Sequence, residues 1–268
     1  MTDRYAVIGN PVEHSKSPLI HTEFARQTAQ DMEYGRILAP IGGFRDSVEQ
    51  FRAKGGRGLN VTVPFKEDAY LYATQLTQRA QLAHAVNTLH FRPDGSVLGD
   101  TTDGVGLVRD IVDNLGVSLH GKRILLMGAG GAARGVLQPL LDANPAHLFL
   151  VNRTAEKAMA LKGMFPAIEA GGYEDLSGLA FDVVINATAS SLNNDLPPLP
   201  EAIFASGALA YDMMYGRTTP FMQFAGAHGA AVVADGLGML VEQAAESFFI
   251  WRGARPATAA VMARFRTA

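Results

Sequence analysis

The sequence predicts an α/β protein built on parallel β-sheet, and three observations support this fold class. Short apolar runs, the pattern of strands buried on both faces of a parallel sheet, recur at regular spacing between segments of helical periodicity. One of these runs, residues 124–127, continues directly into a glycine-rich turn. The composition is that of a compact protein, with 48% hydrophobic residues, 18% charged residues and 28 glycines. The length of 268 residues indicates two domains of about 100 to 150 residues each.

The bulk properties exclude several classes of function. The formal net charge is −3 and no dense run of Lys and Arg occurs, so we expect neither nucleic acid nor a membrane surface as a partner. The absence of cysteine excludes disulfides, thiolate metal sites and cysteine nucleophiles, and we expect no metal. The first residues lack a signal-peptide hydrophobic region, and no apolar stretch is long enough to span a bilayer. We therefore expect a cytoplasmic protein.

Strands and helices alternate along the whole chain. Strands are predicted at residues 5–8, 32–38, 59–63, 124–127, 147–151, 181–185, 208–212 and 230–234, with a hairpin of 85–91 and 96–98 around Pro93-Asp94-Gly95. Helices are predicted at residues 17–29, 42–54, 67–73, 105–115 and 238–251, with two more that begin near Ala132 and at Pro256.

Several polar side chains in the first part of the chain are candidates for function. Ser17 before Pro18 is a good N-cap for the first helix, but capping does not explain Ser15, and the two hydroxyls together could cradle a carboxylate. Lys66 stands at or just before a helix N-terminus, where a cation is disfavoured by roughly 0.3 to 1 kcal/mol. It follows the carboxyl end of a predicted parallel strand, where α/β proteins place their sites, and this favours a functional role. The alternative is a lysine side chain that simply points into water. Asp103, taken alone, is best explained as the N-cap of the helix at 105–115.

The glycine-rich turn after residues 124–127 fits a dinucleotide-binding fingerprint. Gly128, Gly130 and Ala133 match G-x-G-x-x-G/A, in which the first glycine makes a tight turn and the second lets the backbone approach a pyrophosphate. The helix that follows offers free N–H groups and the positive end of its dipole to an anion. A glycine-rich turn before a buried helix, without a ligand, is the alternative explanation.

The end of the next strand decides between the two nicotinamide cofactors. An NAD-binding unit would carry Asp or Glu there, but this chain has Asn152-Arg153-Thr154. An amide, a guanidinium and a hydroxyl would hold a 2′-phosphate that a carboxylate would repel, and Lys157 adds charge nearby. The residues therefore predict NADP, although Lys157 alone could be merely solvated.

Eight motifs carry a resemblance to a known family. They are Ser15-Lys-Ser17-Pro18, Asn60-Val-Thr62-Val-Pro64-Phe-Lys66, Ala85-Val-Asn87-Thr88, Thr102-Asp103-Gly104, Gly128-Ala-Gly-Gly131, Asn152-Arg-Thr154, Tyr211-Asp-Met-Met-Tyr215 and Gly236-Leu-Gly-Met-Leu-Val-Glu-Gln243. Their order and gaps along essentially the whole chain closely resemble the shikimate dehydrogenase family. The resemblance implies a Rossmann dinucleotide-binding domain at 104–237 and a smaller α/β substrate domain, formed by 1–103 together with 238–268, with a cleft between them.

The family resemblance also implies an activity and a set of site residues. The activity is the reversible NADPH-dependent reduction of 3-dehydroshikimate to shikimate in the chorismate pathway. Lys66 and Asp103 would be the catalytic pair, and which of them donates the proton stays open. The substrate-binding residues would be Ser15, Ser17, Thr62, Asn87, Tyr215 and Gln243. The cofactor-binding residues would be Gly128, Ala129, Gly130, Gly131, Ala132, Asn152, Arg153, Thr154, Lys157, Met213 and Gly236.

The chain departs from the family pattern at three positions, and two other functions stay open. Thr101 stands where asparagine is common, Lys157 replaces a frequent arginine, and Ser191 occupies a loop position that is often glycine. One alternative is a quinate/shikimate dehydrogenase with relaxed specificity. The other is a non-catalytic NADP or metabolite sensor on the same fold. A monomer and a homodimer are both compatible with the sequence.

Overall fold

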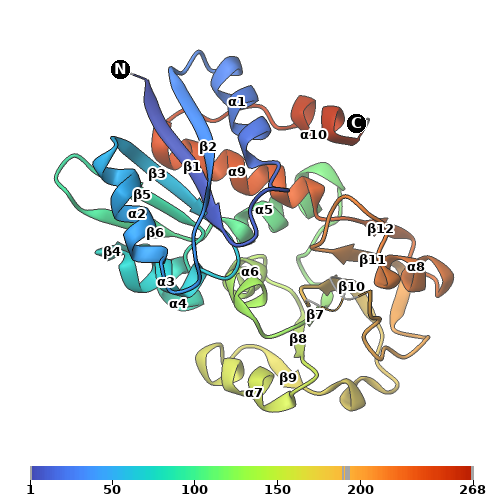
Figure 1. Cartoon of the computed structure of the whole chain (residues 1–268). Helices are drawn as coiled ribbons and strands as arrows, with labels where there is room; N and C mark the ends of the chain where they lie inside the picture. Colours follow the sequence, from blue (N-terminus) through green and yellow to red (C-terminus); the bar gives the residue numbers. More distant parts are fainter. Residues whose placement is uncertain (1, 189, 191–193, 267–268) are drawn as a thin grey trace. The chain divides into compact units, whose positions relative to one another are not determined.

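A computed structural model describes residues 2–188, 190 and 194–266 of the chain. The chain divides into two compact units (Figure 1). The first unit combines Met1–Gly106 with Val241–Ala268, and the second is Leu107–Leu240. The first unit is therefore discontinuous in sequence, and its second segment consists of most of helix α9 (Leu237–Arg252) and helix α10 (Ala259–Arg266).

The first unit contains a mixed six-stranded sheet in the order β2-β1-β3-β5-β6-β4. Its strands are β1 (Asp3–Gly9), β2 (Met32–Leu38), β3 (Gly56–Val61), β4 (Gln75–Leu76), β5 (Thr88–Phe91) and β6 (Val97–Asp100). β1 pairs in parallel with β2 and β3, whereas β5 is antiparallel to β3 and β6. The Met1–Gly106 segment of this unit contains helices α1 (Ser17–Gln27), α2 (Phe44–Ala53), α3 (Lys66–Tyr72) and α4 (Gln78–Ala83), and the start of α5 (Asp103–Arg109).

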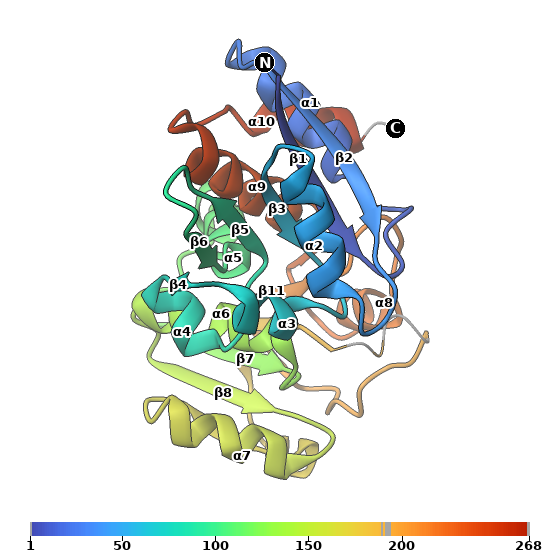
Figure 2. The ribbon, with the colours of Figure 1, turned by 60° about the vertical axis from the view of Figure 1, so that its left-hand side comes forward.

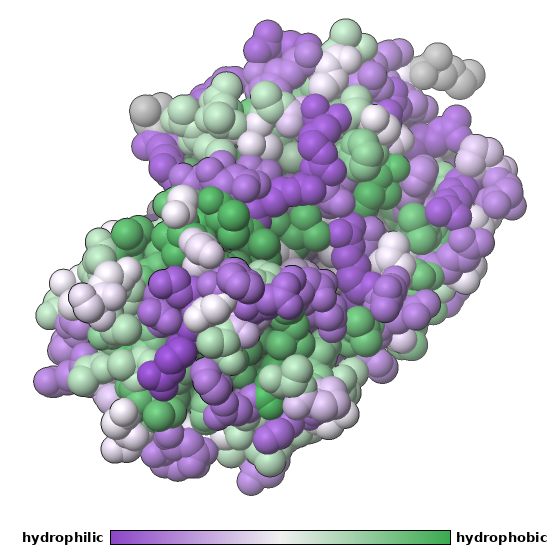
Figure 3. Space-filling view, turned by 180° about the vertical axis from the view of Figure 1, so that it is seen from behind, coloured by the Kyte–Doolittle hydropathy of each residue, from purple (hydrophilic) through white to green (hydrophobic). Residues whose placement is uncertain are grey.

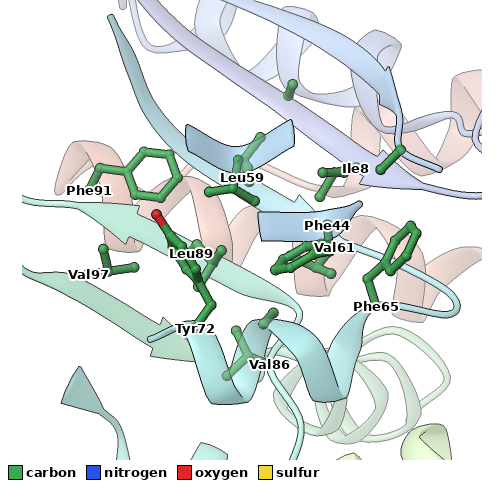
Figure 4. Packing of buried hydrophobic residues seen from close by; sticks show 14 of the residues in the cluster. Ile8, Phe44, Leu59, Val61, Phe65, Tyr72, Val86, Leu89, Phe91 and Val97 are labelled. Carbon is green, nitrogen blue, oxygen red and sulfur yellow. The ribbon is translucent and has the colours of Figure 1, made fainter. Parts of the chain in front are cut away.

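The two faces of this sheet follow from the alternation of side chains along β3. Leu59 and Val61 belong to the apolar cluster shown in Figure 4, which includes Phe44 of α2 and Phe65 just before α3. Asn60, on the opposite face, donates a hydrogen bond to Ser247 of α9. Helices α2 and α9 therefore cover opposite faces of the sheet (Figure 2), and the face toward α9 carries the buried polar residues.

The second unit contains a six-stranded sheet in which every pair is parallel, in the order β12-β11-β10-β7-β8-β9. Numbered within this unit the order is 3-2-1-4-5-6 read from β9, which is the dinucleotide-binding arrangement. Its strands are β7 (Arg123–Met127), β8 (His147–Val151), β9 (Glu169–Gly171), β10 (Phe181–Asn186), β11 (Phe204–Asp212) and β12 (Val232–Ala234). Its helices beyond the end of α5 are η1 (Asp110–Asn114), α6 (Gly131–Asp142), α7 (Ala155–Met164), η2 (Tyr173–Leu176) and α8 (Pro220–Ala227). The α/β fold class is confirmed.

Several predicted element ends were wrong. Lys16, not Ser17, is the N-cap of α1, and α1 ends at Gln27 because Ala29 takes a left-handed conformation with φ 51°. The helix predicted at 105–115 is instead α5 followed by a five-residue π-helix, η1. Asp103 is the first residue of α5. The last helix begins at Ala259 rather than Pro256.

On the face seen in Figure 3, hydrophilic residues are interspersed with hydrophobic ones. Within the described ranges, no helix has both the length and the apolar character that crossing a membrane requires.

Candidate active site

Lys66 and Asp103 form an ion pair in the first unit. Lys66 follows the short loop after β3 and opens α3, and its Nζ donates to Asp103 Oδ2 at 2.6 Å. The two side chains are only 21% and 12% exposed. Lys66 is therefore not a solvated surface lysine: its charge is offset by a carboxylate despite the unfavourable helix position.

Asn87 holds the other oxygen of Asp103. Its Nδ2 donates to Asp103 Oδ1 at 2.8 Å, and its Oδ1 accepts from the backbone N–H of Thr102 at 2.9 Å. A backbone N–H can only donate, so this bond fixes the amide with its oxygen toward Thr102 and its NH₂ toward Asp103. Asn87 precedes β5 instead of lying within the hairpin strand, where the sequence analysis placed it.

Gln243 reaches this group from α9. Its Oε1 accepts from Asn87 Nδ2 and from Thr102 Oγ1, each at 3.4 Å. One turn later, Ser247 Oγ donates to Gln243 O at 3.1 Å and lies 2.8 Å from Thr88 Oγ1. A connected set of hydroxyls and amides thus adjoins the Lys66–Asp103 pair.

Ser15 and Ser17 contact each other at the start of α1. Ser15 Oγ lies 3.2 Å from Ser17 Oγ and accepts from the Ser17 backbone N–H at 3.3 Å. Because no side chain caps this helix, the Ser17 hydroxyl does not serve as the predicted cap. Arg36 Nη2 donates to Ser15 O at 2.6 Å, which brings a cation to the two hydroxyls. Sequence reasoning missed Arg36, because β2 and the α1 start meet only in the folded sheet.

Thr62 directly follows β3 and is held by the end of the neighbouring strand β1. Its backbone N–H donates to Ile8 O at 3.0 Å, and its half-buried side chain lies against Gly9. A Cβ at Gly9 would lie 2.4 Å from Thr62 Cγ2, so glycine is needed there. The Thr62 side chain therefore keeps its position only while residue 9 has no Cβ.

The candidate residues divide between the two units. The first unit holds Ser15, Ser17, Thr62, Lys66, Asn87, Asp103 and Gln243. Tyr215 and every cofactor candidate belong to the second unit. Burial raises the pKa of the Tyr215 phenol, which therefore remains protonated and able to donate a hydrogen bond. Thr88, Thr102 and Ser247, which sequence reasoning did not single out as site residues, belong to the hydrogen-bonded group in the first unit.

The glycine-rich turn has the backbone that nucleotide binding requires. Gly128 follows β7 with φ 110°, and a Cβ there would lie 3.0 Å from Ala187 O. Helix α6 begins at Gly131, and among the described residues no atom lies within 4 Å of a Cβ built at Gly130. Ala129 and Ala132 flank this turn and are half-buried. The turn lies where the strand order reverses between β7 and β10, the place at which open α/β sheets bind their ligands.

The segment after β8 presents cations. Asn152 Nδ2 donates to Thr154 O at 2.9 Å, which closes the turn. Arg153, Thr154 and Lys157 are exposed, and across the described ranges no carboxylate is within ion-pair distance of either cation. These groups and the turn after β7 fit a dinucleotide with a 2′-phosphate.

Met213 and Gly236 meet at the end of β11. Met213 N donates to Asn186 O at 3.0 Å, and Asp212, fully buried, accepts from Met214 N at 2.9 Å. A Cβ at Gly236 would lie 2.3 Å from Met213 O. Gly236 is therefore required by close backbone approach. Ser191, one of the three departures from the family pattern, lies outside the described residues.

Family models match most of the chain. A model of the shikimate dehydrogenase substrate binding domain matches residues 7–89. A shikimate / quinate 5-dehydrogenase model matches residues 107–194, and a model of the shikimate 5′-dehydrogenase C-terminal domain matches residues 236–264.

Similar proteins span the same length. The shikimate dehydrogenase (NADP(+)) of Methylobacillus flagellatus is 60% identical over 270 residues, covering 99% of this chain and 100% of that protein. The protein of the same name from Chromobacterium violaceum is 60% identical over 262 residues, covering 96% of each.

Solved structures share the fold. An Ael1 enzyme from Pseudomonas putida superimposes with a TM-score of 0.95 at 50% identity over 98% of each chain. The shikimate 5-dehydrogenase of Thermus thermophilus, in complex with NADP(H) and shikimate, gives a TM-score of 0.88 at 30% identity over 99% of each chain.

Proposed function

This chain belongs to the shikimate dehydrogenase family, and we propose that it catalyses the reversible NADPH-dependent reduction of 3-dehydroshikimate to shikimate. It is an NADP-dependent oxidoreductase that acts on a CH–OH group, and its place is in chorismate and aromatic amino acid biosynthesis. In this proposal, residues 1–103 with 238–268 bind the substrate and residues 104–237 bind NADP.

The observation that carries the proposed chemistry is the Lys66–Asp103 ion pair. NADPH supplies a hydride to the ketone carbon, and the ketone oxygen must gain a proton. Lys66 Nζ has donor hydrogens, whereas both oxygens of Asp103 accept hydrogen bonds. Lys66 is therefore the better candidate for proton donor, and Asp103 holds its ammonium in place.

The substrate groups match the remaining candidate side chains. We propose that the carboxylate is bound by Ser15 and Ser17, together with Tyr215 of the second unit. Arg36, which donates to the Ser15 carbonyl, adds a positive charge near the two serines. Thr62, Asn87 and Gln243 are proposed to bind the ring hydroxyls. Asn87 and Gln243 share one hydrogen-bonded group with Asp103, which supports recognition of hydroxyls close to the reacting carbon.

The cofactor is NADP. Arg153, with Asn152, Thr154 and Lys157, is proposed to hold the 2′-phosphate. The turn Gly128–Ala132 is proposed to hold the pyrophosphate on the α6 N-terminus. Met213 and Gly236 are proposed to contact the nicotinamide half of the cofactor.

The test follows the absorbance of the reduced nicotinamide ring during incubation with the purified protein. Shikimate and quinate are each combined with NADP⁺ and with NAD⁺. Rapid reduction of NADP⁺ with shikimate and slow reduction in the other three combinations supports the proposal. Comparable rates with quinate would favour the relaxed-specificity enzyme, and binding of NADPH without turnover would favour a sensor.

A further inference from the structure

The carboxylate of Asp100 lies close to the residues that hold the catalytic pair and has no role in the chemistry described above. Asp100 is the last residue of β6, and its carboxyl side chain is only 5% exposed. Arg79 of α4 grips it through Nε and Nη2, at 2.6 and 2.7 Å, and Thr77 Oγ1 donates to it at 2.6 Å. A buried carboxylate held by a two-pronged arginine is a rigid anchor, because both charges are paired in fixed geometry.

Asp100 contacts the backbone of both segments that carry the site. Its Oδ1 accepts from the Thr101 backbone N–H at 2.7 Å, and its main-chain carbonyl accepts from the Asn87 N–H at 3.0 Å. Asn87 donates to Asp103, the partner of Lys66, at 2.8 Å. Asp100 thus holds the backbone at Asn87 and at Thr101, two residues before Asp103.

Arg79 also links Asp100 to α9. Its Nη2 lies 3.3 Å from Glu246 Oε1, and Arg255 Nη2 donates to Glu246 Oε2 at 2.8 Å. Glu246 is three residues after Gln243 on the same helix, so Arg79 contacts the part of α9 that supplies Gln243. The four charges alternate in sign, and removal of any one leaves a partly buried charge without one of its partners.

We propose that Asp100, gripped by Arg79, is a positioning residue that sets Asp103 and Asn87 for proton transfer by Lys66. This inference rests on the proposed function. It assigns Asp100 no contact with the substrate or cofactor. Its effect on turnover passes through the orientation of Asp103.

The test is Asp100→Asn, because an NH₂ in place of either oxygen would face an Arg79 donor, and in place of Oδ1 it would also face the Thr77 hydroxyl and the Thr101 N–H. We expect kcat for shikimate oxidation to fall by about 10- to 100-fold, as small misplacements do, with KM for NADP⁺ within about twofold of wild type. Arg79→Lys keeps the charge but loses the fork, and we expect a smaller fall of kcat in the same direction. This second variant tests the inference if Asp100→Asn does not fold.

The matched control is Asp3→Asn. Asp3 lies at the start of β1 and, like Asp100, pairs with an arginine, in this case Arg252 of α9. It contacts no site residue among those described. We expect it to lower the melting temperature without lowering kcat. If Asp100→Asn behaves like Asp3→Asn, Asp100 has a purely structural role and the inference is wrong.

A double-mutant cycle with Asp103→Asn separates positioning from general destabilisation. If Asp100 acts through Asp103, Asp100→Asn should cost less than about threefold in kcat once Asp103 is already changed. Equal costs in both backgrounds would overturn the inference. Wild-type protein that does not oxidise shikimate in the same assay would overturn the proposed function itself, and the inference with it.

Discussion

At the scale of single residues, the unfavourable placement of Lys66 is the feature that led us to propose a function for it. A cation at the first position of a helix opposes the helix dipole, and Asp103 offsets that cost at 2.6 Å. The position of Lys66 after a strand could be read from the sequence. Its pairing with Asp103 could not be derived from spacing, because the two are 37 positions apart and meet only through the sheet.

Arg153 should decide the choice of cofactor. We expect Arg153→Ser to raise KM for NADP⁺ by about 10- to 100-fold, because a hydrogen bond to a charged group contributes roughly 1.5 to 3 kcal/mol. KM for NAD⁺, which lacks the 2′-phosphate, should change by less than about twofold. Lys157→Ser is the matched control, and its smaller effect would place the main contact at Arg153. Equal effects of Arg153→Ser on both cofactors would contradict the assignment.

His21 makes the stability of the first unit depend on pH. Its ring is fully buried against Tyr34, 4.2 Å between ring centroids, and burial lowers its pKa from 6.5 to about 3. The unfolded chain therefore binds a proton below pH 6.5 that the folded chain does not bind until about pH 3. Stability is lost as the pH falls through this window, by at most about 1.4 kcal/mol per pH unit from this group.

Urea unfolding at about pH 7 and at about pH 5 measures this contribution. We expect His21→Phe to lose less stability than the wild type between the two pH values, because it removes the buried group that must stay neutral. The exposed His14→Gln is the control and should follow the wild type. Parallel pH dependence in wild type and His21→Phe would show that the buried ring does not titrate in this way.

At the scale of elements, α9 packs closely against the sheet of the first unit. Its Trp251 stacks on Tyr5, and Trp251 Nε1 donates to Leu89 O at 3.0 Å. Gly58 of β3 leaves room for this ring, since a Cβ there would lie 2.5 Å from Trp251 Nε1 and 2.7 Å from Leu89 O. The close packing of α9 on the sheet therefore depends on one glycine.

Gly58→Ala should destabilise the first unit. Overpacking of this kind costs about 1 to 3 kcal/mol, because both the indole and the backbone of β5 must shift. The measurement is the free energy of unfolding in urea. Gly163→Ala in α7 is the control, since a Cβ there meets no described atom within 4 Å and alanine favours a helix. A free energy of unfolding for Gly58→Ala that is no lower than that of Gly163→Ala would mean that Trp251 has space to move.

The elements also show where prediction from sequence stops. β7, β8 and β10 were predicted to within a residue because each is a continuous apolar run. β9 was not predicted, since Glu169–Gly171 has no apolar run and pairs only because β8 offers it an edge. The N-cap of α1 was assigned to Ser17 because local preference favours serine, whereas the Ser17 hydroxyl is engaged with Ser15.

At the scale of the whole molecule, the order of predicted strands and helices along the chain indicated the fold class better than it indicated the residues of the site. The glycine turn and the residues after β8 indicated NADP, and the 3-2-1-4-5-6 strand order brings both to the carboxyl ends of neighbouring strands. The group formed by Asn60, Thr88, Thr102 and Ser247 was missed. Short polar residues of this kind have no sequence spacing of their own. The pairing of β3 with β5 brings Asn60 to Thr88, and the return of α9 to the first unit adds Ser247.

The central claim is that Lys66, held by Asp103, supplies the proton, and the kcat of Lys66→Ala for shikimate oxidation with NADP⁺ tests it most directly. Lys54→Ala, at an exposed lysine outside the site, is the control. We expect Lys66→Ala to lower kcat by about 10²- to 10⁴-fold with a smaller change in KM, while Lys54→Ala stays near wild type. A folded Lys66→Ala protein with near-normal kcat would remove Lys66 from the chemistry.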